Sequence, residues 1–278
     1  MLKNVEEDIS IIITLYKTPT ESIQLLNQYK NFKVLIFNQS EEYDSKKRLD
    51  DILKFNFEYY SSKKNLGNSK SSNILLSKVK TKYCLFTQPD VTINGQTIKK
   101  LVNCMKLRDD IIFAGPIIKS DEGISDKDTE QNYIKKEYLD ASCMLCDVEK
   151  TREIGFFDEN FFLYWNDEDL MARVNKSNYI MIQSLDSFAI HKSSQSSKNS
   201  FKVDLIRGVS FKYGEFLYDY KYKKFRLIKL LRQFIQNLFF ILFNFLFLRF
   251  KEALKNISYL IGIVIFVKFI ILNRKPLL

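Results

Sequence analysis

Ile9-Ser-Ile-Ile-Ile-Thr14 is a short, almost wholly apolar run rich in β-branched residues. Such a run predicts a strand that is buried on both faces, as in a parallel sheet. Lys33-Val-Leu-Ile-Phe37 and Tyr83-Cys-Leu-Phe-Thr87 repeat the pattern. We therefore expect an α/β fold with a doubly wound, mostly parallel, Rossmann-like sheet. The further elements expected along the chain are helices over 21–29, 45–55, 68–78 and 96–107, and short strands over 57–60 and 111–114.

The excess positive charge of the chain is concentrated near its C-terminal end. The formal net charge is +10, from 43 Lys and Arg against 33 Asp and Glu. Residues 221–278 contain twelve Lys or Arg and one acid, Glu252, which leaves a net charge of −1 for residues 1–220. A nucleic-acid-binding protein would carry basic residues across its folded body, so this distribution argues against that class. We predict a domain over 1–220 and a basic tail over 221–278 that meets an anionic partner.

Two uncharged stretches lie in this tail. Residues 233–248 contain no charged side chain, and residues 257–267 form a second such run. Each is shorter than the ~20 apolar residues that a spanning helix needs. The basic residues that flank both runs are typical of helices at the surface of an anionic membrane. We expect a helical membrane-associating extension, peripheral or monotopic; a spanning hairpin and helices packed only against protein are the alternatives.

The cysteines and residues 1–8 indicate the cellular compartment in which we expect the protein. Residues 1–8 contain three acids where a secretory signal needs a basic start and an apolar run, so we expect no signal and a body on the cytoplasmic face of the membrane. Cys143 and Cys146 have the spacing of half a zinc site, but His191 and the other two cysteines are far away in sequence. Buried, reduced thiols on a strand are the preferred interpretation. The chain contains four cysteines, Cys84, Cys104, Cys143 and Cys146.

Ligands of doubly wound sheets bind at the carboxyl ends of the strands. In this chain those positions are residues 14–18, 38–40 and 88–90. Asp90 follows a buried strand, where its carboxylate could hold Mg²⁺ or Mn²⁺. Pro-Asp is also common turn chemistry, so this residue alone leaves both roles open.

A second acidic cluster follows a dense aromatic segment, in Gly155-Phe-Phe-Asp-Glu-Asn-Phe-Phe-Leu-Tyr-Trp-Asn-Asp-Glu-Asp-Leu-Met-Ala-Arg173. Asn166 is a good N-cap, and acids in a first turn offset the helix dipole, so a helix start alone could explain the cluster. The aromatic side chains also offer an apolar wall. A carboxylate beside such a wall has a raised proton affinity and can act as a general base.

Phe157-Asp-Glu-x-Phe-Phe-Leu-Tyr-x-x-Asp-x-Asp-Leu-x-x-Arg173 resembles the signature of family 2 glycosyltransferases, most closely their bacterial rhamnosyltransferase-like branch. The resemblance runs through residues 8–200. It implies a GT-A fold, a nucleotide-sugar donor, a divalent metal (Mg²⁺ or Mn²⁺) and inversion at the anomeric carbon. The other segments that resemble this group occur in the expected order: Asn65-Leu-Gly67 with Asn73, Leu85-Phe-Thr-Gln-Pro-Asp-Val91, and Ala189-Ile-His-Lys-Ser-Ser-Gln-Ser196.

The resemblance assigns roles residue by residue. Asp167 matches the base that takes the proton of the acceptor hydroxyl, and Asp169 matches a second Asp that orients the acceptor or the base. Asp90 matches the metal-binding Asp, and His191 matches a histidine near the diphosphate and the metal. The residues expected to bind the donor, from their strand-end positions or from the resemblance, are Thr14, Tyr16, Lys17, Asn38, Asn65, Gly67, Asn73 and Gln88.

Three positions depart from the family pattern. Asn166 stands where the family usually has Glu, and Gln88 stands where it has Asn or Asp. Both changes leave the carboxylates of Asp90 and Asp167 in place. Phe37 stands where many members have an Asp that contacts the nucleobase, so other polar side chains at the strand ends would recognise the base.

We therefore expect an inverting hexosyltransferase that moves a sugar, L-rhamnose from dTDP-rhamnose on the strength of the resemblance, to a hydroxyl of a lipid-linked saccharide. A lipid-linked acceptor would explain the membrane-facing tail and points to O-antigen, capsule or other cell-surface polysaccharide synthesis. The alternatives are a hexosyltransferase that uses a UDP-sugar and a non-catalytic, membrane-anchored scaffold. A scaffold predicts damaged carboxylates, whereas Asp90 and Asp167 are present.

Overall fold

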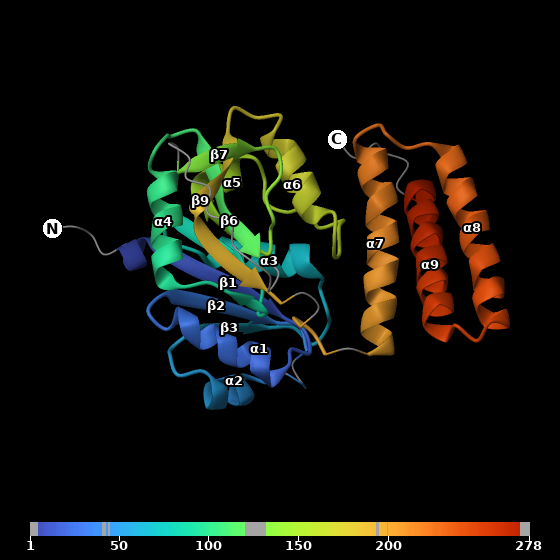
Figure 1. Cartoon of the computed structure of the whole chain (residues 1–278), viewed down its shortest axis with the longest axis horizontal. Helices are drawn as coiled ribbons and strands as arrows, with labels where there is room; N and C mark the ends of the chain where they lie inside the picture. Colours follow the sequence, from blue (N-terminus) through green and yellow to red (C-terminus); the bar gives the residue numbers. More distant parts are fainter. Residues whose placement is uncertain are drawn as a thin grey trace. The chain divides into compact units, whose positions relative to one another are not determined.

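The chain forms two compact units, which we describe separately. The computed structural model describes residues 5–40, 43, 45–119, 132–192, 195–198 and 200–272. The first unit comprises Met1–Asp158 and Leu170–Lys198, and the second comprises Glu159–Asp169 and Asn199–Leu278. Figure 1 shows a sheet covered by helices in the first unit and three long helices, α7, α8 and α9, in the second.

The first unit is built on one twisted sheet. Within the described part of the chain it has nine strands, in the order β3-β2-β1-β4-β8-β6-β9-β5, with β7 paired to β9. β1 pairs in parallel with β2 and β4, and β2 with β3, whereas β8 runs antiparallel to β4 and β6. The strands are β1 (Ile9–Leu15), β2 (Lys33–Asn38), β3 (Glu58–Ser61), β4 (Tyr83–Thr87), β5 (Val91–Thr92), β6 (Ile111–Lys119), β7 (Tyr133–Lys136), β8 (Cys143–Asp147) and β9 (Ile180–His191).

Helices cover both faces of this sheet, which confirms the doubly wound prediction. Successive strand residues point to opposite faces, so Ile11 and Ile13 of β1 join one core and Ile12 joins the other. The first core also contains residues of α1, α2 and α4, and the second contains residues of α3 and of the later part of α6. The helices of this unit are α1 (Thr20–Leu25), α2 (Lys46–Ile52), α3 (Asn68–Lys78), α4 (Gly95–Met105), α5 (Val148–Glu153) and, beginning in the second unit, α6 (Asn166–Val174), with short 3₁₀ turns at Val5–Asp8 and Leu26–Tyr29.

The two closely spaced cysteines do not form half of a zinc site. Cys143 and Cys146 both lie on β8, three residues apart, and therefore face opposite sides of the sheet. Cys143 belongs to the first core and Cys146 to the second. All four cysteines are free and buried, as the preferred interpretation of the sequence states.

The second unit is a bundle of three long helices, α7 (Phe201–Lys221), α8 (Leu227–Leu246) and α9 (Phe250–Leu272). α9 packs against both α7 and α8. The contact of α7 with α9 is very close: a Cβ atom on Gly262 would lie 2.6 Å from the carbonyl oxygen of Val209, and one on Gly208 would overlap Ser258. Small residues that let two backbones approach in this way are typical of helices that pack inside membranes.

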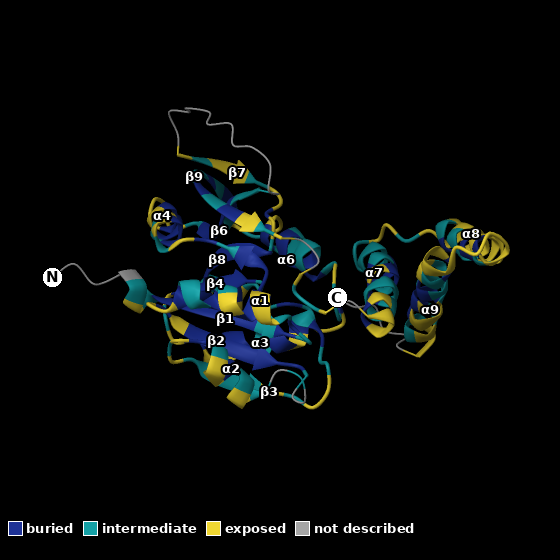
Figure 2. Cartoon of the chain, turned by 60° about the horizontal axis from the view of Figure 1, so that its bottom comes forward, coloured by how far each residue is buried: buried dark blue, intermediate teal, exposed yellow. Residues whose placement is uncertain are grey.

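The exposed side of α8 is more apolar than its buried side. Its buried residues are Leu230, Asn237 and Asn244, of which two carry amides. Figure 2 shows much of α8 in the colour of exposed residues. A helix of a water-soluble protein has the opposite arrangement, with its apolar stripe inside. The large apolar residues exposed on α8 are Leu227, Ile228, Leu231, Ile235, Leu238, Phe239, Phe240, Leu242, Phe243, Phe245 and Leu246.

Two predictions about the tail need revision. α9 has 23 residues and a mean hydropathy of 1.9 in its most apolar window, so by length and composition it could cross a membrane. The expectation that both uncharged runs are too short is thus wrong for α9, because Lys268 interrupts the run without ending the helix. The boundary predicted after residue 220 falls inside the last turn of α7, whereas the second unit takes in all of α7. α7 belongs there because Phe216 and Leu217 share a core with residues of α9.

Candidate functional site

The carboxyl ends of β2, β1 and β4 meet at one edge of the first unit's sheet, because the three strands are parallel. Thr14 is near the end of β1, and Asn38 is the last residue of β2. The segments that follow β1 and β4 carry the other predicted donor-binding residues of this edge, Tyr16, Lys17 and Gln88. The predicted grouping of these five residues at the strand ends is therefore present in the fold.

Asp90 and His191 are brought together by a short pair of strands. β5 pairs antiparallel with the end of β9, with Val91 opposite His191. Asp90, which precedes β5, is only 1% exposed. Its Oδ1 lies 3.6 Å from Nε2 of His191, and its Oδ2 accepts a hydrogen bond from the backbone N–H of Gln195 at 3.1 Å. The contact from Gln195 could not be predicted from the sequence, because a backbone donor does not depend on residue type.

The environment of this pair suits a divalent cation. Oδ1 of Asp90 is buried and accepts no hydrogen bond from the described residues, an unfavourable state for a carboxylate oxygen that the 3.6 Å contact with His191 only partly relieves. The Asp90 carboxylate also raises the pKa of His191, against the opposing effect of burial. Among the described residues no group of three or more His, Cys, Asp and Glu could hold a metal. Asp90 and His191 would therefore supply two ligands, and the remainder would come from phosphate oxygens and water, as is common for Mg²⁺.

Asn38 holds the loops around the strand ends. Its side chain is fully buried and donates from Nδ2 to the hydroxyl of Tyr59 at 2.9 Å. Its Oδ1 accepts from the backbone N–H of Ser40 at 2.8 Å, and the Ser40 hydroxyl in turn accepts from the N–H of Lys17 at 2.8 Å. These bonds give Asn38 a structural role; its contact with the donor stays a prediction.

The predicted Asn65, Gly67 and Asn73 surround the start of α3. Asn65 Oδ1 accepts from the N–H of Gly67 at 3.0 Å, and Gly67 precedes α3 with a φ of 82°, which favours glycine. Asn73 forms a reciprocal pair with Phe157: Nδ2 donates to its carbonyl at 2.9 Å, and Oδ1 accepts from its N–H at 3.0 Å. Asn73 thus anchors the beginning of the aromatic segment, and its contact with the donor stays a prediction.

The acidic helix α6 begins in the second unit after a sharp backbone reversal. Tyr164 and Trp165 have φ values of 65° and 63°, which are strained for residues with side chains. Packing holds this conformation, since Trp165 Nε1 donates to the carbonyl of Phe211 at 3.0 Å and its ring lies against Gly214, where a Cβ would be 2.7 Å away. The N–H of Asp169 donates to the carbonyl of Trp165 at 3.0 Å, which fixes the first turn of α6.

Asp169 is fully buried and bound on its carboxylate. Its Oδ1 lies 2.7 Å from Nζ of Lys221 and accepts from the hydroxyl of Tyr222 at 2.9 Å. Both partners come from the end of α7 within the second unit. This placement suits the predicted orienting role of Asp169 better than direct contact with a substrate. Sequence reasoning missed both partners because it assigned Lys221 and Tyr222 to the membrane-facing tail.

Glu168 is a further residue that the sequence left without a role. Burial and a hydrogen bond with Asp167 raise the pKa of Glu168 to about 8. Near neutral pH its carboxyl therefore keeps a proton and can donate a hydrogen bond to the half-buried carboxylate of Asp167. The proposed base thus has a hydrogen-bond donor beside it rather than a second negative charge. The signal in the sequence was the adjacency of the two acids in one helical turn.

Comparisons with known proteins identify the fold. The profile described as glycosyl transferase family 2 matches residues 10–170. No curated protein matches the sequence. A mannosyltransferase, PcManGT from Pyrobaculum calidifontis in complex with GDP-Man and Mn²⁺, superposes with a TM-score of 0.54 and 10% identity, over 95% of this chain and 75% of that one.

Two further solved structures are much longer than this chain. GalNAc-T7 with UDP, GalNAc and Mn²⁺ has a TM-score of 0.52 and 10% identity, over 74% of this chain and 46% of its own. TarS of S. aureus has a TM-score of 0.51 and 15% identity, over 73% of this chain and 39% of its own. The chain thus spans less than half the length of either protein. At these identities the likeness shows the fold alone, and the fold is GT-A.

Proposed function

Because the chain belongs to glycosyl transferase family 2 through residues 10–170, we propose that it is an inverting glycosyltransferase that uses a nucleotide-sugar donor. One observation supports this above all: a buried Asp90 oxygen that accepts no hydrogen bond within the described part of the chain lies 3.6 Å from His191. The pair stands near the carboxyl ends of the strands, where sheets of this kind bind ligands.

The reaction is a single displacement. The acceptor hydroxyl oxygen bonds to the anomeric carbon of the donor sugar as the bond from that carbon to the diphosphate oxygen breaks. The hydroxyl proton passes to the carboxylate of Asp167, the nucleoside diphosphate leaves, and the anomeric configuration inverts. Glu168, with its raised pKa, donates a hydrogen bond to Asp167, and Asp169, held by Lys221 and Tyr222, fixes the turn that carries the base.

Asp90 and His191 would hold the divalent ion, Mg²⁺ or Mn²⁺. When bound, such an ion stabilises the negative charge that develops on a leaving diphosphate. The buried Oδ1 of Asp90, which accepts no hydrogen bond from the described residues, supports this assignment. The strand-end residues around Asn38 and Lys17 would contact the donor.

The donor proposed from the motifs is dTDP-L-rhamnose, and a UDP-sugar is its competitor. The acceptor proposed is a lipid-linked saccharide of cell-surface polysaccharide synthesis. The apolar outer face of α8 supports an acceptor of this kind, because it would keep the protein at the surface that carries such lipids.

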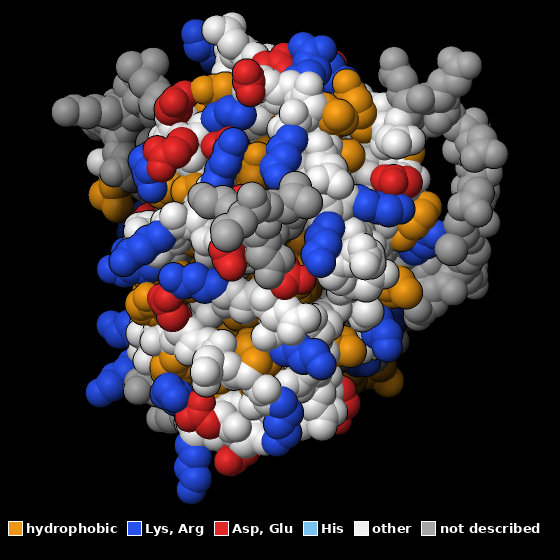
Figure 3. All heavy atoms as spheres, turned by 90° about the vertical axis from the view of Figure 1, so that its left-hand side faces the viewer, with side chains coloured by type: hydrophobic (Ala, Val, Ile, Leu, Met, Phe, Trp, Pro, Cys, Tyr) orange, Lys and Arg blue, Asp and Glu red, His pale blue; other side chains and the backbone are white. Residues whose placement is uncertain are grey.

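We further assign the second unit to the cytoplasmic face of the membrane, as a peripheral or monotopic attachment. The exposed apolar residues of α8 and α9 form a surface much larger than single exposed residues explain. The interleaved Lys, Arg, Asp and Glu side chains on the face shown in Figure 3 contrast with that apolar surface. The full chain should float with phosphatidylglycerol vesicles, less at high salt but not to zero, since apolar contact is unscreened. A chain that does not float and instead self-associates would favour packing against protein.

Calorimetry of nucleoside diphosphate binding tests the metal assignment. With Mn²⁺ present, Asp90→Asn should weaken binding at least about tenfold, because the remaining ligand set has lost its one carboxylate. Asp110→Asn is the matched control, since Asp110 is a surface carboxylate paired with Arg108 at 2.6 Å. Equal affinity of the Asp90→Asn variant and the wild type would show that Asp90 does not hold the metal.

A further inference from the structure

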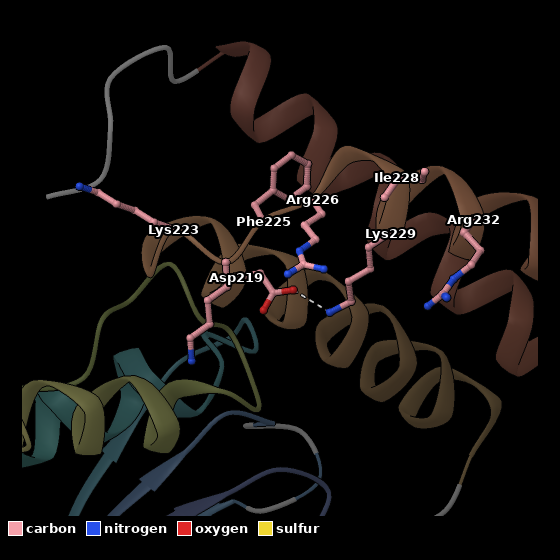
Figure 4. Close-up of a pocket in the computed structure, with 8 residues that line it drawn as sticks. Asp219, Lys223, Phe225, Arg226, Ile228, Lys229 and Arg232 are labelled. Carbon is pink, nitrogen blue, oxygen red and sulfur yellow. Dashed lines mark hydrogen bonds and ion pairs between the residues drawn. The ribbon is translucent and has the colours of Figure 1, made fainter.

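A basic cavity lies in the second unit where α7 gives way to α8. Its volume is ≈ 800 Å³. Figure 4 shows Arg226 and Lys229 directed toward the same region as Asp219, with Lys223 and Arg232 at opposite ends of the view. Five cations and one carboxylate line it, which makes it an attractive place for an anion. The lining residues are Asp219, Lys223, Lys224, Phe225, Arg226, Ile228, Lys229 and Arg232.

Most of this positive charge is not neutralised by carboxylates of the described residues. Lys229 is paired with Asp219 at 2.6 Å and with Glu215 at 2.7 Å. Lys223, Lys224, Arg226 and Arg232 form no ion pair with any carboxylate of the described residues. Four cationic side chains of one cavity are thus available to a ligand.

The backbone at Lys223 is strained. Its N–H donates to the carbonyl of Tyr220 at 3.2 Å, and the N–H of Lys224 donates to that of Asp219 at 2.7 Å. These two bonds make a Schellman motif, whose left-handed residue is usually glycine, yet Lys223 occupies that position with a φ of 57°. A helix end of this kind favours glycine, so the lysine is the less stable choice at this position. Leu248 has the same conformation at the end of α8, with a φ of 55°, and offers a comparison.

The basic cavity continues into an apolar groove on α8. This second cavity has a volume of ≈ 630 Å³ and shares Ile228 and Arg232 with the first. Its apolar residues are open to solvent, with Ile228 76% and Ile235 65% exposed. A ligand that fills both cavities has an anionic head and an apolar chain. The groove is lined by Ile228, Leu231, Arg232, Ile235, Gln236, Phe239 and Phe240.

We propose that the junction of α7 and α8 binds the phosphate headgroup of a membrane lipid, with the apolar chain of that lipid lying along α8. Four uncompensated cations suit a headgroup with two or more negative charges, a phosphomonoester or a diphosphate, better than a singly charged phosphodiester. Arg226 and Arg232 can each bind phosphate oxygens through two N–H groups. The site rests on the proposed membrane attachment and is independent of sugar transfer.

Titration calorimetry of the full chain in a neutral detergent tests the ligand class. Dihexanoyl phosphatidic acid should bind at least about tenfold more tightly than two comparison ligands. Dihexanoyl phosphatidylcholine has the same chains without net charge, and inorganic phosphate has the charge without chains. Equal binding of inorganic phosphate would make this a site for free phosphate and overturn the lipid assignment. Because the calorimetry contains no bilayer, a lack of phosphatidic acid binding is distinct from a lack of membrane attachment, which vesicle flotation measures.

Removing two positive charges inside the cavity, and two outside it, distinguishes a defined lipid-binding site from diffuse electrostatic attraction. Arg226→Gln with Arg232→Gln should weaken phosphatidic acid binding at least about tenfold, since both guanidinium groups line the cavity. Arg249→Gln with Lys251→Gln removes the same charge just before α9 and in its first turn, and should change the affinity less than about threefold. Equal losses in the two double variants would overturn the proposal.

Substituting glycine for the strained residue at each helix end separates an effect on lipid binding from an effect on stability. Lys223→Gly and Leu248→Gly should both raise the unfolding midpoint, because glycine adopts a positive φ without strain. Lys223→Gly alone should also weaken phosphatidic acid binding. If Lys223→Gly binds this lipid as tightly as the wild type, the lysine has no part in the site.

Discussion

Replacing Asp169 by Asn removes the charge from a buried ion pair while keeping the shape of the side chain. The side chain of Asp169 is 0% exposed and that of Lys221 is 15% exposed. Oδ1 of Asp169 lies 2.7 Å from Nζ of Lys221. The hydroxyl of Tyr222, which donates to Asp169 at 2.9 Å, can donate to the side-chain oxygen of the Asn instead. The main effect of the substitution is therefore that the Lys221 ammonium loses its buried counter-charge. Breaking a buried pair costs about 3–5 kcal/mol, and the partial access of Lys221 to water should reduce this to about 2–3 kcal/mol.

Denaturant unfolding of the full chain in a mild detergent measures this loss. Trp165 is the one tryptophan of the sequence and lies in the second unit, so its fluorescence follows the relevant part of the chain. Asp204→Asn on α7 is the control, because Asp204 is 58% exposed and 4.0 Å from Arg207 and should cost less than about 0.5 kcal/mol. Adding Lys221→Met to Asp169→Asn should recover part of the loss. Equal costs for Asp169→Asn and Asp204→Asn, or no coupling to Lys221, would refute the role of the pair.

Three further changes test other parts of the account. The pKa of Glu168 is raised from 4.5 to about 8, so the folded chain binds this proton more tightly than the unfolded chain, and stability should fall as pH rises through that window; Glu168→Gln should flatten the fall in thermal midpoint, and an unchanged profile would contradict the shift. Gly262→Leu must push α9 away from a carbonyl 2.6 Å from its Cβ and should cost about 3 kcal/mol or more, whereas Gly95→Ala, with its nearest atom at 3.9 Å, should be tolerated. Asn73→Ala breaks two hydrogen bonds of 2.9 and 3.0 Å and should cost about 2 kcal/mol in denaturant unfolding; the exposed Asn103→Ala should change stability by less than about 0.5 kcal/mol, and equal effects would argue against the anchor.

The central parallel strands β1, β2 and β4 were predictable because burial leaves a local mark in the sequence. Ile11, Leu35 and Leu85 stand in runs whose apolar character identifies central strands without knowledge of their neighbours. The meeting of Asp90 and His191 was expected only from resemblance. It depends on β5, a strand of two residues whose pairing with the end of β9 has no signal in composition.

The second unit shows what charge counting cannot reveal. Lys221 counted as one basic residue of a tail, but it is paired with a buried carboxylate distant in the sequence. The raised pKa of Glu168 likewise depends on burial, which follows from packing rather than residue type. Lys268 looked like an interruption of an apolar run, yet a lysine stem can extend toward water while the helix continues.

Release of nucleoside diphosphate from a panel of nucleotide-sugars tests the central claim most directly. The full chain, with Mg²⁺ or Mn²⁺ and a lipid-linked acceptor, should turn over at least one donor among dTDP-rhamnose, UDP-sugars and GDP-mannose. Asp167→Asn should still bind that donor and should slow transfer by about 10²–10⁴, the usual contribution of a positioned base. Asp90→Asn should abolish turnover. If no nucleotide-sugar is bound or consumed, the chain is a scaffold with a glycosyltransferase fold and not the enzyme proposed here. If both variants retain the wild-type rate, Asp167 and Asp90 do not carry the reaction.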